Sequence, residues 1–495
     1  MTEGSALGRA EAVVDAAGIA PALEARLDVG VRPRQLAVRT LLVGIVLTVG
    51  DDRPAHLARV HRALVALAPS DKARLGVVLE WKGGPHELTY RQVEYTFGRV
   101  VGVLGRDEAN GEPSTLLRRV IDALVEASVP AHYKEASRAL AIDWSDQESF
   151  ARPPGSAAEK GADPEASWGH RNAGLAKADL FFGYYFSAAV MVREEDGAAV
   201  PELVRRMLVS SCHLDPVPAF VERLEALAAS GVALGDVLAD SGYAHRCAEH
   251  FALPLRRAGA NLVMDLHPVD RGPHGTYGGA IAHNGNLYCP STPPALFALG
   301  PLSRGASSED RAAHDIGTGE LARYKLGPIT ASDADGYGRV MCPAVAGKLR
   351  CPRRAASLTL GYDRPEITSP PDPAPRCCTQ QTMSVPPEVN AKTAQKHDYP
   401  SKAHRASYAR RTAVERSYAT VKDPASTDVT RGWCRVMGLA AISLLLACAV
   451  VVRNGRVVDA FEERQRIDAR RQAAGLEPRT RKRRRRTLDD LIAAG

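Results

Sequence analysis

The stretch Leu180-Phe-Phe-Gly-Tyr-Tyr-Phe-Ser-Ala-Ala-Val-Met-Val192 is long, apolar and rich in aromatic residues. Aromatic and β-branched residues favour extended backbone, so the stretch predicts one or two buried strands. Two shorter apolar runs flank it at a distance, and each leads into an aspartate. These runs are Leu140–Ile142 before Asp143 and Val237–Ala239 before Asp240.

Helical patterns separate these runs. We expect helices over Val217–Ala229 and Ala244–Leu255, and a further strand over Asn261–Leu266. Strands that alternate with helices are typical of an α/β layer fold. A chain of 495 residues is also too long for one ordinary domain.

Residues 1 to about 130 look helical, including an Arg-rich apolar stretch at Arg32–Val49. A second helix is expected to begin at Thr89, because Gln92 lies three positions later in the arrangement of a capping box. Arg91 and Arg99 fall off the apolar stripe of this helix. They are either DNA-reading cations or ordinary surface arginines, and the pattern does not choose between these.

Residues 268–400 contain 17 of the 33 prolines, which predicts a loop-rich or β-rich insertion without long helices. Helical pattern returns over Lys402–Lys422 and again over Arg435–Val451, where it is apolar nearly all round and therefore buried. The apolar run Met437–Val452 is shorter than the about 20 residues of a membrane span. The N-terminus shows no secretory signal, so we expect a soluble, cytoplasmic protein without membrane contact.

Positive charge is concentrated at the C-terminal end. Residues 401–495 hold 21 basic and 10 acidic side chains, whereas the other 400 residues hold 43 and 47. The surplus ends in the run Arg481-Lys-Arg-Arg-Arg-Arg486. A polyanionic partner such as nucleic acid explains this distribution, and a solvated tail is the alternative.

The nine cysteines are odd in number and irregular in spacing, which argues against a disulfide framework. Cys289, Cys342 and Cys351 each precede a proline, and Cys377 and Cys378 are adjacent. Structural zinc normally uses close pairs such as C-x2-C, and these spacings are wider. Zinc binding by the insertion is therefore left open.

The pattern Tyr408-x2-Arg411-x3-Glu415-x6-Lys422 carries the clearest chemistry. At about 100° per residue, the last three side chains fall within about 60° of Tyr408 on a helix. One helix face would then present a carboxylate flanked by two cations and a phenol. The cations should keep Glu415 ionised and could hold phosphate groups beside it.

This pattern resembles the Tyr-Arg-Glu-Lys signature of the "four" family of insertion-sequence transposases, a branch of the acidic-triad (DDE) recombinases. The resemblance makes Glu415 the third carboxylate of the triad. Asp240, in Val237-Leu-Ala-Asp240-Ser-Gly-Tyr243, is similar to the second. Asp143 matches the first, although Trp144 is bulkier than the residue usual at that place.

The resemblance implies a ribonuclease-H-like core interrupted by the Pro/Gly-rich insertion and preceded by a helical domain. We expect five parts: a DNA-end-binding helical domain (1–130), two parts of the core (136–267 and 401–452), the insertion (268–400) and a basic tail (453–495). It also implies two Mg²⁺ or Mn²⁺ ions held by Asp143, Asp240 and Glu415. Tyr408, Arg411 and Lys422 would contact DNA.

The implied activity is cleavage at element ends followed by strand transfer of the 3′-OH into target DNA, by a homodimer acting on terminal inverted repeats near the nucleoid. Asp146 is the competing first carboxylate, and we prefer Asp143 because it should end its strand. A decayed or domesticated DNA-binding relative and a host nuclease on the same fold remain as alternatives.

Overall fold

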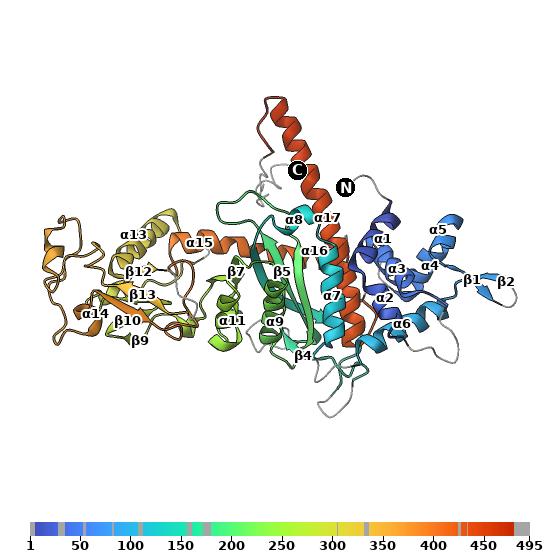
Figure 1. Ribbon diagram of the computed structural model, residues 1–495, viewed down its shortest axis with the longest axis horizontal. Coiled ribbons are helices and arrows are strands. Elements are labelled where there is room, and N and C mark those ends of the chain that lie inside the picture. Colours follow the sequence, from blue (N-terminus) through green and yellow to red (C-terminus); the bar gives the residue numbers. More distant parts are fainter. Residues whose placement is uncertain are drawn as a thin grey trace, which may run out of the picture.

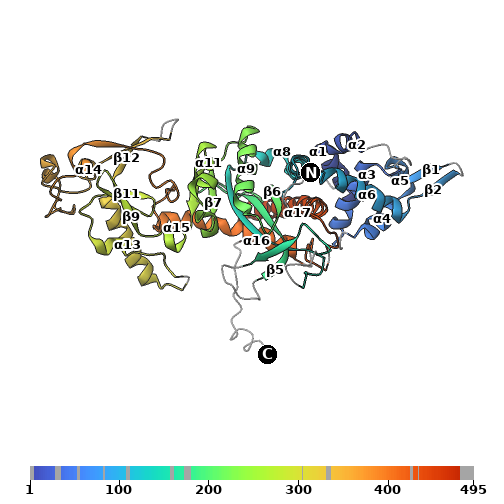
Figure 2. The same ribbon diagram turned by 90° about the horizontal axis from the view of Figure 1, so that it is seen from below.

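The computed structural model of the protein describes residues 5–27, 35–52, 56–81, 84–106, 112–155, 161–171, 180–303, 305–330, 336–423, 427–432 and 434–479. The basic run Arg481–Arg486 lies outside these residues. The fold combines helices with mixed sheets. A helical region and the insertion lie at opposite ends of the molecule, with the main sheet between them (Figure 1, Figure 2).

The main sheet has six strands. They are β3 (Ala139–Glu148), β4 (Ser167–His170), β5 (Leu180–Val192), β6 (Val204–Ser211), β7 (Asp236–Ala239) and β8 (Asn261–Met264). Both β4 and β6 pair with β5, and the order continues β5-β3-β7-β8. The β6-β5-β3 pairings are antiparallel, whereas β3-β7 and β7-β8 are parallel.

The sheet is covered on both faces. Leu140 and Ile142 of β3 belong to a core shared with α9 (Pro216–Ala229) and α11 (Ala252–Arg257). The alternate residues Ala139 and Ala141 belong to the other core. That second core contains residues of α16 (Thr412–Lys422) and α17 (Leu439–Ala473) and extends into the N-terminal helices. The period of two along β3 therefore sets which side chains face α16.

Eight helices and one hairpin of the described residues precede the main sheet. They are α1 (Ala6–Ala17), α2 (Ile19–Glu24), α3 (Val38–Gly50), α4 (Leu57–Val65), α5 (Pro69–Arg74), β1 (Val78–Trp81), β2 (Gly84–Glu87), α6 (Tyr90–Leu104), α7 (Thr115–Ala127) and α8 (Ala131–Lys134). The capping box predicted at Thr89 and Gln92 is confirmed at the start of α6. Arg39 of α3 pairs with Asp15 and Glu11.

Helix α17 is buried through its first half and packs against α3, α7 and β6. It is the one helix of the described residues that is long and apolar enough to cross a membrane. However, 78% of its most apolar segment is buried inside the protein. The expected end at Val451 is wrong, because the helix continues to Ala473. Good helix formers and ion pairs such as Arg466–Glu463 (2.7 Å) support the extension.

The insertion contains two small sheets. One has β9 (Pro273–Tyr277), β10 (Ala280–His283) and β11 (Asn286–Tyr288), and the other has β12 (Gly327–Thr330), β13 (Gly338–Met341) and β14 (Thr382–Val385). The expectation that it lacks long helices is wrong, because α13 (Ser308–Tyr324) has 17 residues. No proline lies between Pro301 and Pro328, and Ser307 caps the helix together with Asp310.

Three further expectations about the elements need correction. Strand β3 continues for five residues past Asp143, since it pairs with β5 along its full length. The helix expected over Ala244–Leu255 is broken into α10 (Ser241–Ala244), a 3-10 turn and α11. Strand β6 was not anticipated, because Arg205 and Arg206 interrupt its apolar pattern. The Leu180–Val192 stretch is confirmed as one strand.

Candidate active site

Asp143 lies on β3 at the level where the neighbouring strand β7 ends. Side chains alternate between the two faces along β3, and Asp143 is on the same face as Ala139 and Ala141. Its side chain therefore faces the α16 side of the sheet. Its side chain is 16% exposed. Burial, with the nearby negative charge of Asp240, raises the pKa of Asp143 to about 7, and Arg411 opposes the rise. The carboxyl group is therefore poised to gain or lose a proton near neutral pH.

Asp240 comes directly after β7, in register with Asp143. The parallel pairs Leu140–Val237 and Ala141–Leu238 have the same sequence offset, 97, that separates Asp143 from Asp240. The Oδ1 atom of Asp240 accepts hydrogen bonds from the backbone N–H of Gly242 (2.9 Å) and Tyr243 (3.3 Å). Asp240 thus caps the short helix α10 while its charge acts on Asp143.

Trp144, the residue that departs from the expected pattern, packs beneath this turn. Its ring lies 4.7 Å from the ring of Tyr243. A Cβ atom at Gly242 would lie 2.6 Å from the indole, closer than atoms can approach. The bulky tryptophan and the small glycine are therefore complementary, and together they fix the turn that holds Asp240.

Glu415 meets the site through Arg411. The guanidinium of Arg411 donates to Oδ2 of Asp143 (2.9 Å) and to Oε1 of Glu415 (2.5 Å). Tyr408, in α15 (Lys402–Tyr408), has its ring 5.7 Å from the Arg411 guanidinium carbon, and burial raises the pKa of its phenol. Arg411 thereby links the first and third predicted carboxylates, and the side chain of Glu415 remains 52% exposed.

Lys422 lies elsewhere than predicted. Its Nζ atom donates to Oδ1 of Asp146 (2.8 Å), to the Asp146 carbonyl (2.6 Å) and to the Ser145 hydroxyl (2.9 Å). It therefore does not flank Glu415. The expectation that Asp146 has left the strand is also wrong, since β3 ends at Glu148. Although Asp146 is largely buried, Lys422 and Arg171 hold its pKa below the usual value.

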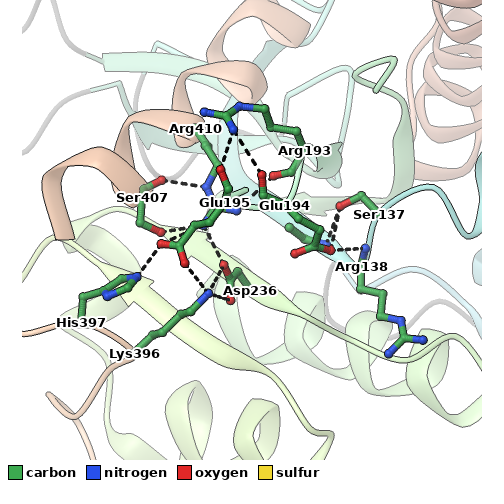
Figure 3. A network of polar contacts seen from close by, with 11 residues as sticks. Ser137, Arg138, Arg193, Glu194, Glu195, Asp236, Lys396, His397, Ser407 and Arg410 are labelled. Carbon is green, nitrogen blue, oxygen red and sulfur yellow. Dashed lines mark hydrogen bonds and ion pairs between the residues drawn. The ribbon is translucent and has the colours of Figure 1, made fainter. Parts of the chain in front are cut away.

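A buried polar network fixes the approach of α16 to the sheet (Figure 3). Arg410, in the 3-10 turn before α16, donates to Oδ2 of Asp236 at the start of β7 (2.7 Å), with side-chain exposures of 4% and 3%. Lys396 joins Asp236 to Glu195 (2.9 and 2.6 Å). Glu195 is partly buried, yet hydrogen bonds from Lys396, Ser407 and His397 lower its pKa to about 2. Residues far apart in sequence thus position Arg411 and Glu415.

Two features of this edge escaped the sequence reasoning. Asp265 follows β8 as Asp240 follows β7, since Ala239 pairs with Met264. Its Oδ1 atom accepts from the Tyr399 hydroxyl (2.7 Å). An apolar run ending in aspartate was the available signal, the same one that marked Asp143 and Asp240.

The second feature is a group of potential metal ligands. Ligand atoms of His245, His267 and Asp270 all lie within 4.8 Å of one another, although Lys392 also pairs with Asp270 (2.7 Å). Within the described part of the chain, no other three His, Cys, Asp or Glu ligand atoms are this close. No sequence spacing marked the group formed by His245, His267 and Asp270.

The oxygens of the predicted triad, Asp143, Asp240 and Glu415, do not lie this close together, because Glu415 turns toward Arg411.

Comparison with known proteins adds no family. No protein-family model matches the chain, and no curated protein is significantly similar to it.

Proposed function

We propose that the protein is a metal-dependent DNA transposase of the acidic-triad type. The observation that carries the proposal is the register of β3 and β7, which puts Asp143 and Asp240 side by side at one edge of the sheet. Arg411 then joins Asp143 to Glu415 across to α16. Two aspartates on adjacent strands and a glutamate on a facing helix support the proposal, in which Glu415 turns from Arg411 toward the aspartates when metal binds.

The order of the main sheet supports a ribonuclease-H-like core. Three antiparallel strands, β6-β5-β3, continue into two parallel strands, β7 and β8. In this proposal β3 is the first strand of the core in sequence and supplies Asp143. Helix α16 follows the insertion and returns to the same sheet, where Tyr418 donates to the Asp143 carbonyl (2.6 Å).

The residues at this edge fit a divalent metal. They offer carboxylate oxygens, the ligands that Mg²⁺ and Mn²⁺ prefer. Burial and the charge of Asp240 raise the pKa of Asp143, and a cation bound between the two carboxylates would favour their ionised forms. Asp143, Asp240 and Glu415 would hold the ions, which supply activation of water and charge neutralisation at the scissile phosphate.

The protein's own side chains bind and orient the DNA in this proposal. Arg411 can exchange a carboxylate for a phosphate oxygen, because its planar guanidinium binds both in the same forked geometry. Lys422 holds Ser145 and Asp146, and so it fixes the strand that carries Asp143. Its cation lies on the same helix as Glu415 and would add attraction for the DNA backbone.

A nicking assay on DNA that carries the inverted repeats flanking the gene tests the proposal. We expect cleavage at the repeat ends with Mg²⁺ or Mn²⁺, none with a chelator, and joining of the 3′-OH ends to a second DNA. Asp143→Asn, Asp240→Asn and Glu415→Gln should each reduce cleavage by at least about 100-fold. Glu222→Gln, at an exposed carboxylate of α9 on the opposite face of the sheet, is the control and should retain cleavage.

Cleavage that survives Glu415→Gln would contradict the assigned site. Cleavage of any DNA without preference for flanking repeats, or a gene without such repeats, would favour the host nuclease. Tight binding to the repeats without cleavage would favour the domesticated DNA-binding relative.

A further inference from the structure

Four cysteines of the insertion meet around one cavity. They are Cys289, Cys342, Cys351 and Cys378, and the cavity has a volume of about 10 Å³. A space of this size suits one small ion or a single water molecule. The four residues span 90 positions of sequence, which explains why their spacing resembled no known ligand motif.

We infer that Cys289, Cys342, Cys351 and Cys378 form a structural zinc site that fixes the insertion. Four thiolates are a complete ligand set for tetrahedral zinc, with Zn–S bonds of about 2.3 Å. The inference is independent of the proposed function, since it concerns the insertion and not the sheet edge.

The backbone around these cysteines is shaped to support thiolate ligands. The carbonyls of Cys289 and Cys351 accept from the N–H of Thr292 (3.0 Å) and Arg354 (2.9 Å), so each cysteine begins a tight turn. Burial raises the pKa of both thiols, and hydrogen bonds from the backbone N–H of Ser291 and Arg353 oppose that rise. N–H groups directed at sulfur two residues back stabilise negative charge on it.

The remaining ligands come from equally defined places. Cys342 directly follows β13, and its carbonyl accepts from Ala346 (2.9 Å) in the next turn. Cys378 lies in the short helix α14 (Arg376–Thr379). Its neighbour Cys377 belongs to the apolar core beside Met383 and does not line the cavity. The two adjacent thiols are hydrogen-bonded to each other, and Cys378 is the one that lines the cavity.

The charge and composition of the region agree with a metal. Arg353 and Arg354 line the cavity, and their positive charge would balance the net negative charge of a zinc tetrathiolate. The local apolar core is small, with eight buried residues around Tyr288 and Leu349. Short strands and a small core seldom suffice for stability, and zinc binding contributes folding free energy directly.

Within the described residues no three of these sulfur atoms lie within 4.8 Å of one another. The four sulfur atoms must therefore move closer together when they bind one zinc ion. Rotation about the Cα–Cβ bond is the freedom that each thiol has to approach a bound ion. The thiols should consequently be protected from reagents when metal is bound and reactive after it is removed.

Elemental analysis of the purified full-length protein tests the inference. We expect about one zinc ion per chain that survives gel filtration. Cys342→Ser and Cys378→Ser should each lower the zinc content at least about fivefold, whereas Cys247→Ser, at an exposed cysteine outside the insertion, and Cys377→Ser should not. His267→Ala controls for zinc held by His245, His267 and Asp270.

A second measurement uses the unmodified chain and does not depend on whether the variants fold. Four cysteines should become more reactive toward a thiol reagent when a strong chelator removes the metal, and mass spectrometry should identify them as Cys289, Cys342, Cys351 and Cys378. Absence of zinc, zinc lost only in His267→Ala, bound iron with sulfide, or disulfides among the four cysteines would each overturn the inference.

Discussion

Asp143 and Asp146 lie three residues apart on one strand and have opposite electrostatic environments. Asp143 is buried beside another carboxylate, and its pKa rises to about 7. Asp146 is also largely buried, but Lys422 and Arg171 lower its pKa. The first environment penalises ionisation, which is typical of residues that bind substrates or metals. The second is that of a structural ion pair.

Asp143→Asn should stabilise the metal-free protein at neutral and higher pH. Between about pH 4 and about pH 7 the folded protein keeps a proton on Asp143 that the unfolded chain has lost, so stability falls as the pH rises. Removing the carboxylate should raise the free energy of unfolding by about 1–3 kcal/mol at about pH 8 and change it little at about pH 4. Urea unfolding in a chelator across this range measures the difference.

Asp146→Asn is the matched control and should have the opposite sign. Its loss leaves Lys422 without its carboxylate partner, and the protein should become less stable at neutral pH. Equal effects of the two substitutions would show that the two carboxylates share one environment, against the structure.

At the scale of elements, the edge that carries the site is held by contacts between segments distant in sequence. The turn after β7 depends on Trp144 from β3, and the start of α16 depends on Asp236 of β7. Each contact fixes an element that carries a candidate site residue. Positions that hold these elements should therefore affect activity without touching DNA or metal.

Gly242→Ala should destabilise the turn after β7, because the added Cβ would lie 2.6 Å from Trp144. We expect a loss of about 1–3 kcal/mol in the free energy of unfolding. Trp144→Phe, which removes the larger ring, should restore part of it in the double variant. Additive losses in this double-mutant cycle, measured by denaturant unfolding, would contradict the proposed contact.

Arg410→Ala should cost about 3–5 kcal/mol, because it leaves the buried Asp236 carboxylate without its closest buried partner. The pair Arg416–Glu202 is the exposed counterpart, and Arg416→Ala should cost less than about 1 kcal/mol. The difference between these two variants in thermal and urea unfolding isolates the effect of burial. Similar losses would mean that Lys396 alone satisfies Asp236.

At the scale of the whole molecule, one apolar core joins the N-terminal helices to the sheet. Helix α17 contributes to it along its first half, and Asn454 of this helix bonds the backbone of Val204 at the start of β6 (3.0 and 2.9 Å). The N-terminal helices and the main sheet are therefore expected to move as one body.

Removal of residues 480–495 should weaken DNA binding in a salt-dependent way. The logarithm of the DNA-binding constant falls linearly with the logarithm of the salt concentration, and each phosphate contact adds about 0.9 to the magnitude of that slope. Loss of the six basic residues Arg481–Arg486 should lower that slope by up to about 5 and leave sequence preference unchanged. Titrations at several salt concentrations measure the slope. An unchanged slope would assign the DNA contacts to other residues of the chain.

Local features of the fold could be predicted from the amino-acid sequence. Side-chain period and capping residues fixed the β5 strand, the start of α6 and the extent of α9, because these depend on neighbours within a few positions. Apolar runs that end in aspartate marked Asp143 and Asp240. The spacing of four residues joined Arg411 to Glu415, although the single helix expected over Lys402–Lys422 is wrong, because a 3-10 turn at Ala409–Arg411 divides it into α15 and α16.

Features that depend on partners far away along the chain could not be predicted before the three-dimensional arrangement was known. Arg205 and Arg206 look unsuited to a buried strand until Glu126 of α7 meets their charge (3.3 and 3.1 Å). Likewise, Lys422 pairs with Asp146 and does not lie beside Glu415. Four cysteines that are scattered in sequence line one cavity. The physical reason is that burial of a charge is favourable only with a partner, and that side chains distant in sequence meet in one place only after the chain has folded.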